Sequence, residues 1–142
     1  MVKNTYTIER GVVRVNKVFD GVEENEEGEN NITSDGILVA GAKRVSFMVE
    51  GFDLDGGKEA TLKIRTSIDG GDTYRLHKYL IDTSSPTNGI DYTSEIEAHE
   101  GNKRKLGYLA PETLGAVTHL TARLEIEEVG SGSFDVVVTV QN

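Results

Sequence analysis

The sequence has 142 residues, the length of one ordinary domain, with 15 Lys and Arg against 24 Asp and Glu and a formal net charge of -9. It has no cysteine, which excludes disulfide bonds, zinc sites built on thiolates and thiol catalysis. The negative charge disfavours nucleic acid and anionic membrane surfaces, and no apolar run reaches the ~20 residues of a transmembrane helix. We therefore expect one soluble domain that binds neither nucleic acid nor membrane.

Short stretches of alternating apolar and polar residues run through the chain, separated by many of its 16 glycines. Residues 128–132, between the two clearest stretches, are rich in turn formers and predict a hairpin. The best helical stretch is 94–100, which is short and polar. In chain order we expect strands over 6–19 (broken at Gly11), 37–40, 45–49, 61–65, 74–81, 120–126 and 134–140.

This pattern predicts an all-β fold. Alternation gives each strand one buried and one exposed face, which is typical of antiparallel sheets. Many short strands with turn signals between them favour an antiparallel β-sandwich or a jelly roll. Within one domain we expect an N-terminal arm or strand at 1–19, an acidic loop at 20–35 and a sandwich body at 36–142.

The arm and the acidic loop carry opposite charge. The arm is basic, whereas the loop holds five glutamates between positions 23 and 29. A strand-forming arm is suited to pair with an exposed sheet edge. Either these are two unrelated surface features, or the arm of one copy lies near the loop of the next. For the second case we expect self-association through Tyr6, Ile8, Arg10, Val13, Arg14 and Val15.

The residue patterns of catalytic and metal sites are missing from the sequence. The histidines, His77, His99 and His119, lack the spacing of a zinc site, and there is no nucleophile elbow or phosphate-binding loop. The protein is therefore predicted not to be an enzyme, with no catalytic, cofactor-binding or metal-binding residues.

A stretch that begins like a calcium loop, Asp-Leu-Asp-Gly-Gly at 53–57, does not continue as one. It fails at the fifth and twelfth positions, where glycine and isoleucine stand in place of oxygen ligands. We interpret it as a hairpin turn whose aspartates bond their own backbone. The glutamates of the acidic loop have too much conformational freedom for a selective ion site, so residues 22–31 are expected to be exposed and to bind no ion.

One motif is more specific. Ser67, Asp69, Gly71, Thr73 and Tyr74 resemble an Asp-box, Ser-x-Asp-x-Gly-x-Thr-Trp, with tyrosine in place of tryptophan. The resemblance implies a structural turn in which serine and aspartate bond the backbone and the aromatic ring packs beneath. Asp-boxes recur in sialidase propellers, but this chain has one copy and is too short for a propeller. The resemblance therefore carries no sialidase activity.

A single such turn in a short β-sandwich resembles virion proteins of tailed phages. The similarity covers about residues 37–140 and includes the strand at 45–51, the segment 64–74 and the final strands at 120–140. It implies a structural protein, a capsid decoration protein on the virion surface, made in the host cytoplasm. Its partners would be further copies of itself, in a trimer, and the capsid shell protein. The alternative is a carbohydrate-binding or adhesin-type sandwich, which the absence of tryptophan disfavours.

Overall fold

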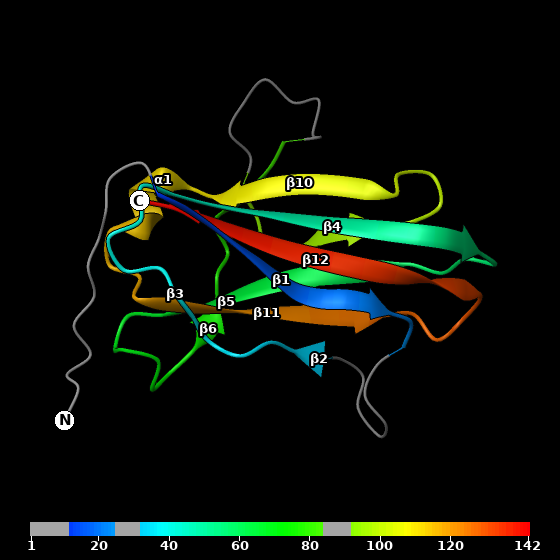
Figure 1. Ribbon diagram of the computed structural model, residues 1–142, viewed down its shortest axis with the longest axis horizontal. Coiled ribbons are helices and arrows are strands. Elements are labelled where there is room, and N and C mark those ends of the chain that lie inside the picture. The colour runs from blue at the N-terminus through cyan, green and yellow to red at the C-terminus, as the bar shows by residue number, and fades with distance from the viewer. Residues whose placement is uncertain (1–11, 25–31, 84–91) are drawn as a thin grey trace.

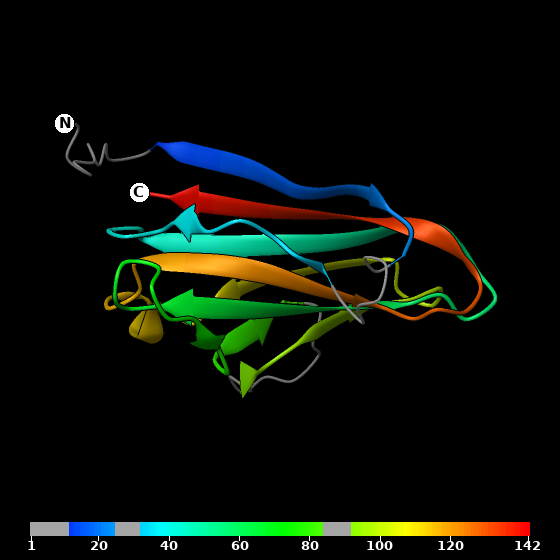
Figure 2. The ribbon, with the colours of Figure 1, turned by 90° about the horizontal axis from the view of Figure 1, so that it is seen from below.

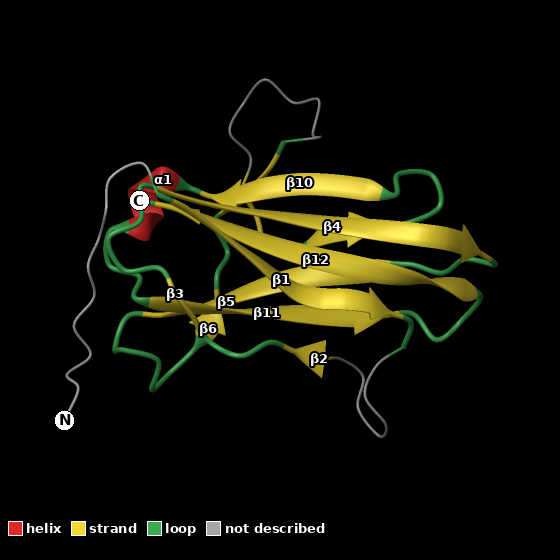
Figure 3. Cartoon of the chain, viewed as in Figure 1, coloured by secondary structure: helices red, strands yellow, loops and turns green. Residues whose placement is uncertain are grey.

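The computed structural model describes residues 12–24, 32–83 and 92–142. Two antiparallel sheets lie face to face, and the one helix within these residues is α1, the four-residue turn Pro111–Leu114 (Figures 1 and 3). The predicted all-β sandwich is confirmed. Segments 1–11, 25–31 and 84–91 lie outside the description, so Tyr6, Ile8 and Arg10 of the predicted arm do too.

Strand order shows that neighbours in sequence are seldom neighbours in a sheet. The first sheet runs β1 (Val13–Val22), β12 (Ser131–Gln141), β4 (Arg44–Asp55), β10 (Arg104–Leu109), β7 (Leu80–Asp82) and β8 (Tyr92–Thr93). The second runs β2 (Ile32–Thr33), β11 (His119–Ile126), β5 (Ala60–Ser67) and β6 (Arg75–Leu76); β3 (Ile37–Leu38) pairs with β11, and β9 (Ile96–Ala98) pairs with β5.

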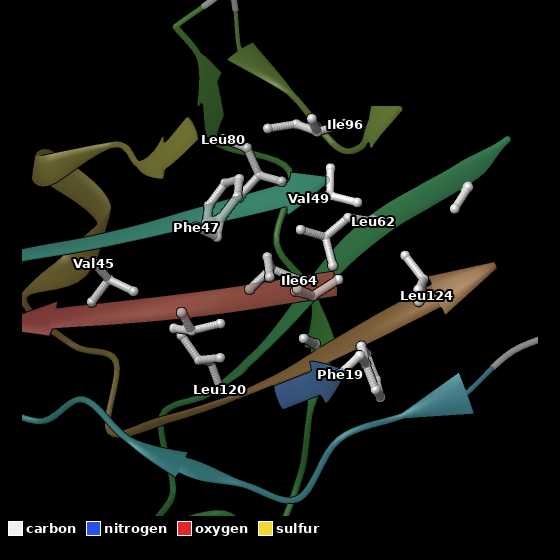
Figure 4. Close-up of a cluster of buried hydrophobic side chains, with 14 of the residues drawn as sticks. Phe19, Val45, Phe47, Val49, Leu62, Ile64, Leu80, Ile96, Leu120 and Leu124 are labelled. Atoms are coloured by element: carbon white, nitrogen blue, oxygen red, sulfur yellow. The ribbon is translucent and has the colours of Figure 1, made fainter. Parts of the chain in front are cut away.

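The core lies between the two sheets. Val45, Phe47 and Val49 of β4 face Leu62 and Ile64 of β5, and all five side chains are at most 2% exposed (Figure 4). On β12 every second residue from Phe134 to Val140 is fully buried in the same layer. Burial of this apolar area, at roughly 25 cal/mol per Å², is the main favourable term in folding.

The hairpin predicted across residues 128–132 is wrong. β11 pairs with β5, whereas β12 pairs with β4 and β1, so the connection crosses from one sheet to the other. The turn after β4 crosses in the same way, and the hairpin interpretation of 53–57 is wrong for the same reason, although Asp55 Oδ1 does accept a bond from Gly56 N at 2.9 Å. The two crossings lie side by side: Glu127 N donates to Glu59 O at 2.9 Å.

Three further predictions need correction. The helical stretch at 94–100 contains strand β9, because Ile96 and Ala98 are buried against β5. The strand at 74–81 is two strands, β6 and β7, which belong to different sheets. The acidic loop is shorter than 20–35, since β1 continues to Val22 and β2 begins at Ile32; Glu23 and Glu24 are exposed. The sequence patterns did not reveal β10 or α1.

Gly130, in the second crossing, is predicted to tolerate no side chain without a large loss of stability. Gly130 has a φ of 67°, and a Cβ there would clash with the Asp55 carbonyl oxygen and the Gly56 backbone. Gly21 is a matched control, with a φ of 64° but no atom within 4 Å of a Cβ. Gly21→Ala should cost the left-handed strain alone, about 1–2 kcal/mol. Gly130→Ala should lower the free energy of unfolding, measured in urea, at least twice as much; equal losses would contradict the packing of the crossings.

Candidate functional site

The residues of the predicted structural turn come together at one end of β5. The buried Ser67 donates from Oγ to Asp69 Oδ1 at 2.6 Å and accepts from Gly71 N at 2.9 Å. The same Asp69 oxygen accepts from Thr73 N at 2.9 Å. These bonds lower the pKa of Asp69 to about 2, and the bond from Ser67 has the largest effect. Gly71 has a φ of 97°, a dihedral suited to glycine. Side chains therefore hold the turn.

The turn is also fixed to the rest of the sandwich. Thr118 N donates to Ser67 O at 2.8 Å, and Gly70 N donates to Thr118 Oγ1 at 3.1 Å. The hydroxyl of Tyr74 lies so close to Gly36 that a Cβ there would be 2.6 Å from it. Ser67 and Asp69 therefore bond groups within the turn, and the Tyr74 hydroxyl lies close to Gly36 and Gly71.

A surface pocket of about 420 Å³ lies beside the turn, and its lining includes the exposed Ile68 and Asp69.

The histidines serve local structure. His77 is 6% exposed; its Nδ1 lies 3.1 Å from Thr66 Oγ1 and its Nε2 lies 3.0 Å from Thr113 Oγ1. Because Thr113 donates its own proton to Ala110 O at 2.7 Å, Nε2 carries the imidazole proton. Sequence patterns could not reveal this buried threonine–histidine–threonine bridge.

The other two histidines also bond nearby groups. His119 Nδ1 lies 3.1 Å from Thr118 Oγ1, and His99 Nδ1 accepts from Gly101 N at 3.1 Å. Within the described segments, no three His, Asp or Glu side chains are grouped to hold a metal ion. The one helix of those segments, α1, is too short to cross a membrane.

A second pocket, of about 350 Å³, lies beside the first crossing between the sheets. Its lining includes Lys58, Glu59 and Glu97, together with His99 and Glu100. Glu100 Oε1 accepts from Gly57 N at 2.9 Å, and His99 closes its own turn, so two of the lining side chains support neighbouring backbone.

The exposed tyrosines do not form a flat platform. Tyr79 and Tyr92 stand with ring centroids 5.4 Å apart at an interplanar angle of 83°. Tyr108 is covered by the Arg44 guanidinium, 4.6 Å from its ring centroid. A sugar ring stacks on coplanar aromatic faces, and the described tyrosines offer no such pair.

The described part of the predicted arm belongs to the sheet of its own chain. Val13, Arg14 and Val15 lie on β1, which pairs with β12 from Val13 to Val22. Arg14 Nη2 donates to Leu38 O at 3.2 Å and so ties β1 to the other sheet. Val13 and Val15 point outward and are 51% and 68% exposed. This part of the arm is therefore not free to pair elsewhere as a separate strand, but no other strand of the described residues pairs with its outer edge.

No protein-family model matches the sequence, and no curated protein matches it. Among solved structures, the chain is similar to the SPBc2 prophage-derived protein YomS, with a TM-score of 0.60 at 7% identity over 97% of this chain and 100% of that one. This likeness shows a shared fold.

Two other solved structures superpose more loosely. Infectious bursal disease virus, Gx strain, matches with a TM-score of 0.47 and 14% identity over 100% of this chain and 36% of that one. The K1 cleaved adhesin domain of Lys-gingipain from Porphyromonas gingivalis gives 0.38 and 10% over 93% of this chain and 99% of that one. Matches below 0.5 bear on neither fold nor function.

Loss of the central carboxylate should loosen the turn. Asp69→Ala removes the acceptor of Ser67 Oγ and Thr73 N, and we expect the melting temperature to fall by several degrees. Asp72→Ala, at an exposed aspartate of the same turn, is the control and should change little. If Asp69→Ala weakened assembly or binding without lowering the melting temperature, Asp69 would be a binding residue rather than a structural one.

Stability should depend on pH through His77. Burial lowers the pKa of His77 below its usual 6.5, so the unfolded chain takes up the proton more readily than the folded chain. The stabilisation that neutral, buried His77 adds to the free energy of unfolding is complete above pH 6.5. It is lost as the pH falls from 6.5 through the lowered pKa of His77 in the folded chain. Urea unfolding at a series of pH values should show this fall in the wild type and in His99→Gln, and much less of it in His77→Gln. An unchanged slope in His77→Gln would contradict the assignment.

Proposed function

We propose that this protein is a structural component of a tailed-phage virion: a capsid decoration protein that self-associates as a trimer on the shell surface after synthesis in the host cytoplasm. The observation that carries the proposal is the full-length superposition on the prophage-derived YomS, at a TM-score of 0.60 over 97% of this chain.

The use of polar groups supports a structural role over a catalytic one. In the Asp69 turn, serine and aspartate bond the turn itself, and the buried His77 is held between two threonine hydroxyls. A catalytic base has to reach a substrate proton at about 2.6–3.2 Å. Asp69 Oδ1 and both ring nitrogens of His77 already have partners within the fold.

Self-association is supported by the outermost strand of the first sheet. β1 ends the strand order, and its two most exposed valines, Val13 and Val15, stand on it. The arm, residues 1–19, has four basic residues (Lys3, Arg10, Arg14 and Lys17) against one acidic residue, Glu9, in a chain with a formal net charge of -9. This favours contact with acidic copies of the same chain or with an acidic shell protein. The sugar-binding alternative lacks a coplanar aromatic pair among the described tyrosines.

The mass of the full chain in solution tests the proposal. Light scattering should give three chain masses, and a chain that begins at residue 12 should give a smaller species. Added to shells purified without the protein, the full chain should co-sediment with them and the shortened chain should bind less. An equal mass for the two chains would mean that residues 1–11 are not needed for self-association. Failure of the full chain to bind shells would remove the decoration role.

A further inference from the structure

We infer that the outer edge of β1 at residues 13–16, which no other described strand pairs with, is the docking site for the N-terminal segment, residues 1–11, of a second copy of this chain. The inference rests on the proposed self-association and names its contact.

The orientation of the backbone shows what this edge offers. Asn142 N donates to Val12 O at 3.0 Å, and the register pairs Arg14 with Val140 and Asn16 with Val138. Because antiparallel bonds alternate along a strand, residues 12, 14 and 16 face β12. Val13, Val15 and Lys17 therefore direct their N–H and C=O groups away from the sheet, where Figure 2 shows β1 as its outermost strand.

Features that discourage strand addition lie in one half of β1. Its pairing is irregular between Lys17 and Phe19 and again between Phe19 and Val22. Lys17 forms an ion pair with Asp20 at 3.0 Å, and Gly21, at a φ of 64°, is held by Asp135. Bulges and charges of this kind blunt an edge against other strands.

The other half of the edge, residues 13–16, has neither a register shift nor an ion pair among the described residues. Val13 and Val15 there are 51% and 68% exposed. A regular, valine-rich edge left uncovered pairs with whatever strand it meets. The register shifts and the ion pair begin at Lys17. The regular stretch before it, residues 13–16, is therefore the part of the edge that we assign to a specific partner strand.

The sequence of residues 1–11 fits that position. Tyr6 and Ile8 alternate with Thr5 and Thr7, a pattern that favours a strand. A segment of one copy that enters the β1 edge of the next makes a head-to-tail contact, and three such contacts can close a ring.

Engineered cysteines test the contact directly, because the chain has none of its own. Full chains carrying Val15→Cys are mixed with size-tagged full chains carrying one cysteine at position 5, 6, 7 or 8, and are then oxidised. We expect mixed cross-links that are strong at alternate arm positions, as a paired strand requires. Val129→Cys, at an exposed valine on a connection between the sheets, is the control for random collision.

Other cross-linking outcomes would overturn the inference in distinguishable ways. A dominant Val15→Cys link to itself would mean that two β1 edges pair about a two-fold axis. A link inside one chain that carries both cysteines would mean that the segment covers its own edge. Mixed links no stronger than the Val129→Cys control, in chains that still assemble, would remove the β1 edge and leave the proposed function intact.

A charge on the edge gives an independent test. Val15→Lys in the full chain should reduce the mass from three chains to one. Its melting temperature should fall no further than that of the chain that begins at residue 12, because the Val15 side chain is exposed and its backbone points away from β12. Val129→Lys, at a valine 52% exposed, should leave the trimer unchanged. An intact trimer in Val15→Lys would overturn the inference, whereas a monomeric wild type would overturn self-association itself.

Discussion

The packing of β4 and β12 against β5 and β11 determines where the rest of the chain lies. These four strands bury alternate apolar residues in one layer, and most of those side chains are fully inaccessible. Within the sheets, β4 pairs with β12 and β5 pairs with β11. The connections from β4 to β5 and from β11 to β12 therefore both pass from one sheet to the other. Close packing tolerates little at such crossings, where Gly56 and Gly130 meet backbone to backbone.

Polar chemistry is concentrated at the ends of that layer. Where the chain leaves β5, Ser67, Asp69 and Thr118 supply bonds that no neighbouring strand provides. His77 does the same between β5 and α1 through Thr66 and Thr113. A buried polar group without a partner costs far more than a paired one contributes, which explains why these side chains are used for closure.

The all-β sandwich and most strand positions could be predicted from sequence, because alternation is local. Strand partners could not be. The segments 120–126 and 134–140 carry the same pattern whether they pair with each other or lie in opposite sheets. Short strands such as Ile96–Ala98 are set by their partner, β5, which outweighs weak local preference. The His77 bridge joins residues 36 positions apart, beyond the reach of any local motif.

The first strand combines two requirements that conflict in an isolated chain. Phe19 must be buried, which fixes β1 on β12, yet that placement leaves β1 at the end of the sheet, where no other described strand pairs with its outer backbone groups. Past Lys17 the conflict is resolved by bulges, an ion pair and Gly21. Before Lys17 the edge stays regular and apolar, which lowers solubility unless a strand covers it. In the proposed assembly, long-range repulsion between acidic copies and one short pairing edge favour contact in a single orientation.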